Sequence, residues 1–249
     1  MTGQPGRDAA GLAQAAGQEG SVESLYPFLY AQTSDLPAVL EQVRASTVAK
    51  AAQIAELRAV IAERDGARLA SCARQAAARF AAGGRLLAFG NGGSASDAAQ
   101  LATLFLNPGD ARPLPALGLA SDAPVLTALC NDIGTDVVFA RQLAAFGGRH
   151  DIAVGLSTSG NSANLLHGFD EAGRRGMLTI GLAGYDGGKM AELDTIDYLF
   201  VAPSASVHRI QEAQTTTYQV LWELTAAALA HSARLNHQEE VAHVPRHTR

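Results

Sequence analysis

Four hydroxyl side chains lie close together directly after the apolar run 152–156. They are Ser157, Thr158, Ser159 and Ser162. A helix that begins at such a segment needs only one hydroxyl as its N-cap, so the cluster exceeds the structural requirement. Clustered hydroxyls and free backbone N–H groups supply the donors that a phosphate monoester needs, with no obligatory metal. The cluster therefore predicts a binding site for a phosphate or a phosphorylated sugar.

A glycine-rich turn after the apolar run 86–89 is a second candidate, and it contains Asn91, Gly92, Gly93 and Ser94. Glycines let the backbone approach a ligand closely, and the N–H groups of a helix that begins near Ser94 favour an anion. The turn is neither a G-x-G-x-x-G nor a Walker A motif, because it lacks the third glycine and the lysine. A tight structural connection is the alternative interpretation.

Further polar residues have two possible roles each. Asn131 and Asp132 follow a helical segment, where they either contact a ligand or form a turn. Gln211 begins the last long helical pattern and faces either solvent or a ligand. The pattern around these residues does not decide between the alternatives.

The elements that must position these residues form an alternating series. Short, continuous apolar runs are separated by helical patterns, and they cover 86–89, 116–119, 152–156, 178–182 and 198–201. Such runs are typical of parallel strands that are buried on both faces, with right-handed helical crossovers. We therefore predict an α/β fold, a doubly wound three-layer αβα sandwich. Its ligands should bind at the carboxyl ends of the strands, after Phe89, Leu119, Leu156 and Leu182.

Two long helical patterns flank this series. Residues 35–82 form one broken helix or two, interpreted as a structural arm, and residues 207–230 form a long last helix. The first 34 residues are predicted to be a flexible leader without the features of a signal peptide, and 231–249 a polar tail. We therefore predict one domain over 35–230.

Composition limits the class of protein. The chain has 249 residues, of which 47% are hydrophobic and 17% charged, and its net charge is −5. It can bury a large core, and its negative charge argues against a general electrostatic contact with nucleic acid. No apolar window reaches the length of a membrane span. Two cysteines cannot form a disulfide framework, so we expect a cytoplasmic protein. The low charge also suits an oligomer.

Several motifs together resemble one known family. GNGGSxxDA, ND, VFARQL, LSTSGNSAN, GYDGGKMA and RIQEA occur in the order typical of phosphoheptose isomerases, which are SIS-domain proteins. The resemblance covers about 35–230. It implies a five-stranded parallel sheet, a sugar phosphate ligand and a homotetramer with sites at subunit interfaces. It also implies a phosphate loop of Ser157, Thr158, Ser159 and Ser162. The sugar contacts it implies are Asn91, Gly92, Gly93, Asn131, Asp132 and Gln211.

The sequence departs from the family at the residues that carry the chemistry. Family members interconvert a ketose phosphate and its aldose, here sedoheptulose 7-phosphate and D-glycero-D-manno-heptose 7-phosphate. A glutamate and a histidine act as the acid–base pair, but Leu104 and Gln219 stand at their positions. In some members these two, a second histidine and the glutamine of RIQE hold zinc. The second histidine is replaced by Gln100, so we expect no metal or other cofactor.

Two hypotheses follow from this departure. The first is a phosphosugar-binding protein that has lost the usual acid–base pair, acting as a sensor or scaffold. The second is an isomerase whose base is supplied by His208, Glu212 or Asp132, or by a partner subunit. A structural or adaptor subunit of a protein complex is a third possibility, for which a related SIS protein that serves replication initiation is a precedent.

Overall fold

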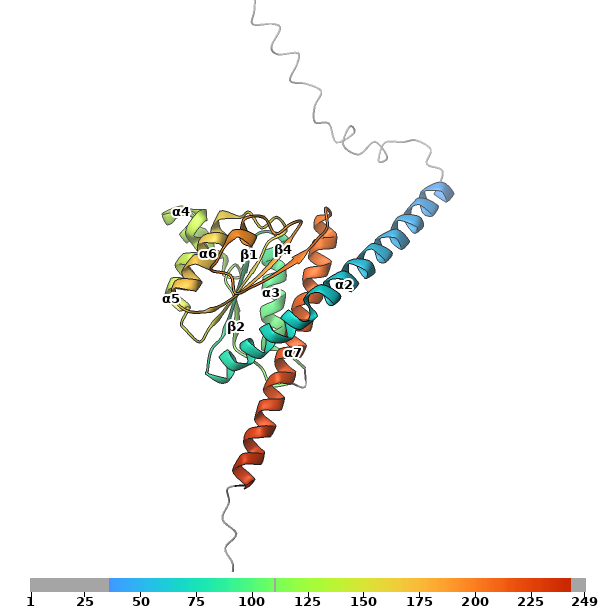
Figure 1. The fold of residues 1–249 in the computed structure, drawn as a ribbon. Helices are drawn as coiled ribbons and strands as arrows, with labels where there is room; N and C mark the ends of the chain where they lie inside the picture. Colours follow the sequence, from blue (N-terminus) through green and yellow to red (C-terminus); the bar gives the residue numbers. More distant parts are fainter. Residues whose placement is uncertain (1–35, 110, 243–249) are drawn as a thin grey trace, which may run out of the picture. The chain divides into compact units, whose positions relative to one another are not determined.

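The computed structural model describes residues 36–109 and 111–242, with side chains described as far as Arg234. The predicted leader and the last seven residues of the predicted tail lie outside these ranges. The chain divides into two units, 1–51 and 52–249. The described part of the first unit is residues 36–51, which belong to helix α2 (Leu36–Ala81; Figure 1).

The second unit is built on a five-stranded sheet in which every pair of neighbouring strands is parallel. The strand order is β2-β1-β3-β4-β5. The strands are β1 (Leu86–Gly90), β2 (Ala116–Gly118), β3 (Ile152–Leu156), β4 (Leu178–Gly184) and β5 (Tyr198–Ala202). The predicted α/β sandwich with a five-stranded parallel sheet is therefore confirmed. All five apolar runs form strands at nearly the predicted positions.

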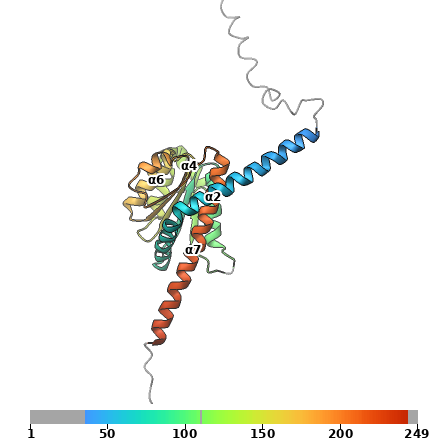
Figure 2. The same cartoon turned by 45° about the vertical axis from the view of Figure 1, so that its right-hand side comes forward.

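Helices cover both faces of the sheet (Figures 1 and 2). Alternate residues of β1 point to opposite sides: Leu86 packs in a core cluster with Leu101 and Tyr218, whereas Leu87 packs in one with Phe139. This arrangement explains why the strands are continuously apolar. The helices are α3 (Gly93–Leu106), α4 (Ala123–Ile133), α5 (Val138–Phe146), α6 (Ala163–Arg174) and α7 (Val207–Ala242), with short 3₁₀ segments η2 (Thr135–Val137) and η3 (Gly188–Glu192).

The helices differ from expectation in four places. Helix α2 is continuous from Leu36 to Ala81, where one broken helix or two were expected. Asn131 and Asp132 lie in the last turn of α4 and do not form a turn. Helix α5 is an additional element. Helix α7 continues to Ala242, past the predicted end at Ala230. None of the helices in the described ranges is long and apolar enough to span a membrane.

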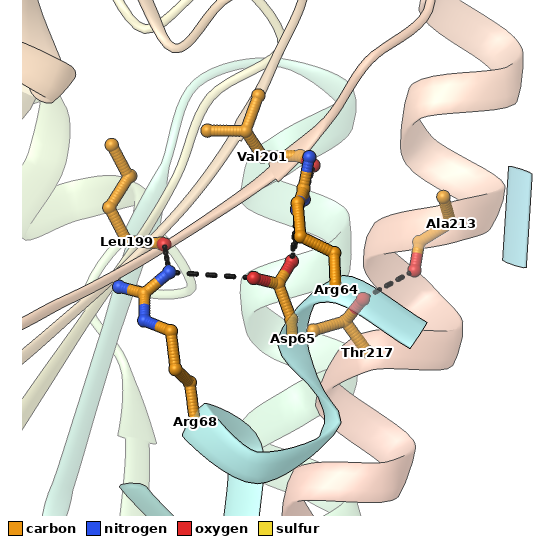
Figure 3. A network of polar contacts seen from close by, with 7 residues as sticks. All are labelled: Arg64, Asp65, Arg68, Leu199, Val201, Ala213 and Thr217. Atoms are coloured by element: carbon orange, nitrogen blue, oxygen red, sulfur yellow. Dashed lines mark hydrogen bonds and ion pairs between the residues drawn. The ribbon is translucent and has the colours of Figure 1, made fainter. Parts of the chain in front are cut away.

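The outer edge of β5 is covered by charged side chains of α2 (Figure 3). Asp65, only 1% exposed, accepts hydrogen bonds from Arg64 and Arg68. The same two guanidinium groups donate to backbone carbonyls of the edge strand, Arg64 to Val201 and Arg68 to Leu199. The strand carbonyls that have no neighbouring strand are therefore satisfied by α2, which fastens the helix to the sheet.

Candidate functional site at the carboxyl edge of the sheet

Two hollows open where the strands end. The first hollow, of about 530 Å³, lies at the switch point between β1 and β3, where the strand order reverses. Asn91, Gly92, Asp136, Ser162 and Asn164 are among the residues that line it. The second hollow, of about 710 Å³, lies after β3, β4 and β5. Ligands of parallel sheets bind at this edge, so both hollows stand where a site is expected. The second hollow is lined by Ser159, Asn161, Tyr185, Asp186, Pro203, Ser204 and Ala205.

A pair of amides connects two sides of the first hollow. Asn91 Nδ2 donates to Asn164 Oδ1 at 2.9 Å, and Asn164 Nδ2 donates to Asn91 Oδ1 at 3.0 Å. Asn91 belongs to the glycine-rich turn and Asn164 to the first turn of α6. The reciprocal bonds hold these two segments in register. Sequence reasoning found Asn91 but missed Asn164, whose signal was its place two residues after Ser162.

The fold gives the clustered hydroxyls different roles. Ser157 is buried, and its Oγ accepts a hydrogen bond from the Gly160 N–H at 3.0 Å, so it shapes the loop itself. Ser162 is the N-cap residue of α6 but makes no capping hydrogen bond, and it lines the first hollow. Ser159 lines the second hollow, and Thr158 is half-buried. The loop therefore separates the two hollows and contributes a serine to each.

Gln211 lies against the glycine-rich turn. A Cβ atom at position 93 would stand 2.3 Å from Gln211 Nε2, so glycine is required for this close approach. Gln211 also lies near Asp97 of α3. Burial raises the pKa of Asp97 above its usual 3.8, and hydrogen bonding by the Gln211 side chain opposes that rise. The approach of α7 to α3 thus places Gln211 beside the backbone of Gly93.

Asn131 and Asp132 do not join this group. Both side chains are exposed in the last turn of α4, where Asn131 Nδ2 donates to Asp132 Oδ1 at 2.9 Å. Their chain neighbours Cys130 and Thr135 line the first hollow instead. The structure of the single chain therefore places the pair beside the first hollow and outside its wall.

The positions that the resemblance links to acid–base chemistry and zinc are occupied in other ways. Gln100 Oε1 accepts a hydrogen bond from the Tyr218 hydroxyl at 3.0 Å. Leu104 packs against the core, and Gln219 is exposed. The four positions thus hold three amides, of Gln100, Gln211 and Gln219, and the alkyl group of Leu104. They are not a zinc-binding set, because zinc prefers thiolate, imidazole and carboxylate. In the described ranges, no group of three or more His, Cys, Asp or Glu residues could hold a metal ion.

Tyr218 donates the hydrogen bond to Gln100. It is fully buried between α7 and α3, and burial raises its pKa. The negative charge of nearby Asp97 raises that pKa further, while a hydrogen bond with Thr215 lowers it. The tyrosine is therefore a neutral hydrogen-bonding link between the two helices near neutral pH.

Two of the three predicted substitutes for the acid–base pair, His208 and Glu212, lie one turn apart in α7, and the third, Asp132, lies in α4. Glu212 Oε1 pairs with Arg209 Nη2 at 2.8 Å, while its Oε2 is buried without a hydrogen-bond partner. His208 is exposed in the first turn of α7, and Asp132 is bonded to Asn131. None of the three lines the first hollow.

Comparison with known proteins agrees with the fold. The model of the SIS domain matches residues 51–184. The chain is 41% identical over 181 residues to a phosphoheptose isomerase of Pelodictyon phaeoclathratiforme, which covers 71% of this chain and 85% of that protein. The structure of the phosphoheptose isomerase of Neisseria gonorrhoeae superposes with a TM-score of 0.67 at 32% identity, covering 75% and 98% of the two chains. That of Francisella tularensis gives 0.69 at 27% identity, covering 76% and 98%.

The chain therefore belongs to the SIS-domain family. Within that family, its relatives in sequence and in structure are phosphoheptose isomerases.

Proposed function

We propose that this protein binds a sugar phosphate of the heptose type, such as sedoheptulose 7-phosphate, without the usual acid–base pair of an isomerase. The observation that carries the proposal is Ser162. Its hydroxyl makes no capping bond at the beginning of α6, and it lines the first hollow at the switch point of the sheet. A phosphate placed there would accept hydrogen bonds from that hydroxyl and from the free N–H groups at the beginning of the helix.

The neutral side chains at the edge of the same hollow suit a polyhydroxylated ligand. The Asn91–Asn164 pair offers amide groups whose remaining donors and acceptors can bond hydroxyls. Gln211 stands behind the glycine-rich turn. The names of the relatives support a heptose phosphate as the ligand.

The second part of the proposal is the loss of the acid–base pair and of zinc. Leucine and glutamine cannot exchange protons near neutral pH, and Leu104 and Gln219 occupy the two positions of the pair. Gln100 stands at the position of the second zinc-binding histidine, and its side chain is already hydrogen-bonded to Tyr218. We propose a ligand-binding protein that acts as a sensor or scaffold.

Calorimetric titration with sedoheptulose 7-phosphate, combined with an NMR assay of its turnover, tests the proposal. We expect binding without conversion to the aldose. Ser162→Ala should weaken binding about tenfold or more, because a hydrogen bond to a charged group contributes about 1.5–3 kcal/mol. Ser232→Ala, at an exposed serine of α7, is the matched control and should leave binding unchanged.

Two other results would replace the proposal. Turnover comparable to that of the relatives would show an isomerase, and variants of His208, Glu212 and Asp132 would then identify its base. Absence of any phosphosugar binding, with a protein that co-purifies, would favour a structural or adaptor subunit. Metal analysis after incubation with zinc tests the proposed loss of the zinc site, since we expect no stoichiometric zinc.

A further inference from the structure

The second hollow has a composition that the proposed function does not use. Its walls combine the ring of Tyr185, the apolar surfaces of Pro203 and Ala205, and several polar groups. Tyr185 is 41% exposed, which is high for an aromatic side chain at the end of a buried strand. A mostly apolar hollow with a few fixed polar groups is the usual form of a small-molecule site.

Tyr185 is held in a conformation that side chains rarely adopt. Its φ is 53°, and it is the only non-glycine residue with a positive φ in the described ranges. This left-handed conformation costs about 1 kcal/mol for a residue with a Cβ atom. Such a conformation persists only where its surroundings enforce it, and it is often found at functional sites.

The surroundings that enforce it are two interlocked loops. The Lys189 N–H donates to Asn161 Oδ1 at 3.0 Å, and the Met190 N–H donates to the Gly160 carbonyl at 3.0 Å. The backbones meet so closely that a Cβ atom at position 160 would collide with the carbonyl of Gly187. The loop that carries Tyr185 is therefore fixed against the serine-rich loop, and its ring is presented in one place.

The polar groups of the second hollow comprise three donors and one carboxylate acceptor. Asn161 uses its oxygen for Lys189, which leaves its NH₂ group as a donor. The hydroxyls of Ser159 and Ser204 accept backbone N–H bonds, so each retains a proton to donate. Asp186 accepts the Gly188 N–H with Oδ1 and keeps Oδ2 as an acceptor. The carboxylate disfavours an anion, and the three donors disfavour a cation.

We propose that the second hollow is a binding site for a neutral carbohydrate ring, separate from the phosphosugar site in the first hollow. The apolar C–H face of the ring packs on the face of Tyr185, since aromatic faces pair well with weakly polarised C–H groups. Vicinal hydroxyls, each a donor and an acceptor, bond Asn161, Ser204 and Asp186. This inference does not depend on the proposed function.

Saturation-transfer NMR with D-glucose, D-mannose and sedoheptulose as probes tests the inference on the full chain. We expect transfer to the ring C–H protons of at least one probe. Transfer should be retained in Tyr185→Phe, which keeps the aromatic face, and reduced at least fivefold in Tyr185→Gly, which removes the ring and accepts a positive φ. Because glycine relieves the backbone strain, thermal unfolding of that variant verifies that the loss is not a loss of folding.

Competition distinguishes the two hollows. Saturating sedoheptulose 7-phosphate should leave the transfer to D-glucose and D-mannose unchanged, and Asn91→Ala should do the same. No transfer to any probe, equal transfer in Tyr185→Gly, or displacement by the sugar phosphate would each overturn the inference. If sedoheptulose 7-phosphate does not bind at all, the proposed function fails while the response of the Tyr185 variants still decides this proposal.

Discussion

Asp97 lies in α3, near Gln211 of the last helix. Its Oδ2 atom is buried and has no hydrogen-bond partner. A carboxylate in such a place loses hydration that the protein does not replace, and this raises its pKa. Asp97 therefore makes the fold less stable when it is ionised.

This linkage predicts a pH-dependent effect of Asp97→Asn. The pKa of Asp97 is higher in the folded state than its usual 3.8, so protonation of this carboxyl stabilises the fold. This stabilisation is fully present below the usual pKa. The contribution is lost as pH rises through the folded-state pKa. The melting temperature of the variant relative to the wild type should therefore increase from pH 3.5 to pH 7. Thermal unfolding across this range measures it, with exposed Asp194→Asn as the control for loss of one carboxyl. A difference that shrinks with rising pH would contradict this account.

Gly93 offers a second test at the residue scale. In Gly93→Ala the new methyl group would meet Gln211 Nε2, the end of a flexible side chain that can move away. We expect stability to change little, because alanine favours the helix by about 1 kcal/mol. Affinity for sedoheptulose 7-phosphate should fall several-fold. Gly66→Ala in α2, where a methyl group meets nothing within 4 Å, is the matched control. Unchanged affinity in Gly93→Ala would remove Gln211 from the site.

At the scale of elements, α2 is attached to the sheet by ionic contacts. Asp65 is buried and its two arginine partners are partly exposed. Arg68 also stacks over the Phe200 ring, with 5.4 Å from its Cζ to the centroid. The attachment therefore combines charge, strand carbonyls and an aromatic face of β5.

Removal of the charge of Asp65 should loosen this attachment. Asp65→Asn leaves the two guanidinium groups close together without their counter-ion, and we expect a loss of about 2 kcal/mol in the free energy of unfolding. Urea denaturation measures the change. Glu63→Gln, two residues away and exposed, is the control. If both variants unfold at the same urea concentration as the wild type, the ion pairs contribute little.

The elements were predictable where local pattern decides them. The five apolar runs form strands, and β1 and β3 are continuously apolar because they are buried on both faces. Asn131 and Asp132 gave no such pattern, and α4 continues through them to Ile133. The Asn91–Asn164 pair joins residues 73 positions apart, so only the completed sheet brings it together. Ser159 lines one hollow and Ser162 the other, and this division also depends on the completed sheet.

At the scale of the whole molecule, large apolar side chains remain on the surface of the second unit. Leu106, Leu117, Val125, Ile133 and Phe146 are each at least 40% exposed. Together with a charged fraction of 17%, this surface suits association with further chains.

We therefore propose a homo-oligomer and expect a tetramer, as the resemblance to phosphoheptose isomerases implies. Light scattering coupled to size-exclusion chromatography should give four times the 25.8 kDa of one chain. Dilution over a hundredfold range should not change that mass if the association is tight. A mass of one chain at all concentrations would contradict the proposal.

The arginines along β5 have a consequence for behaviour in concentrated solution. A sheet can grow by adding a strand from another molecule wherever its outermost strand offers free backbone groups. Here Arg64 and Arg68 already occupy the carbonyls of Leu199 and Val201 at one border. At the opposite border β2 has only three residues, too few for a long new pairing. Both edge strands are thereby protected from pairing with strands of other molecules, which would lead to fibrils.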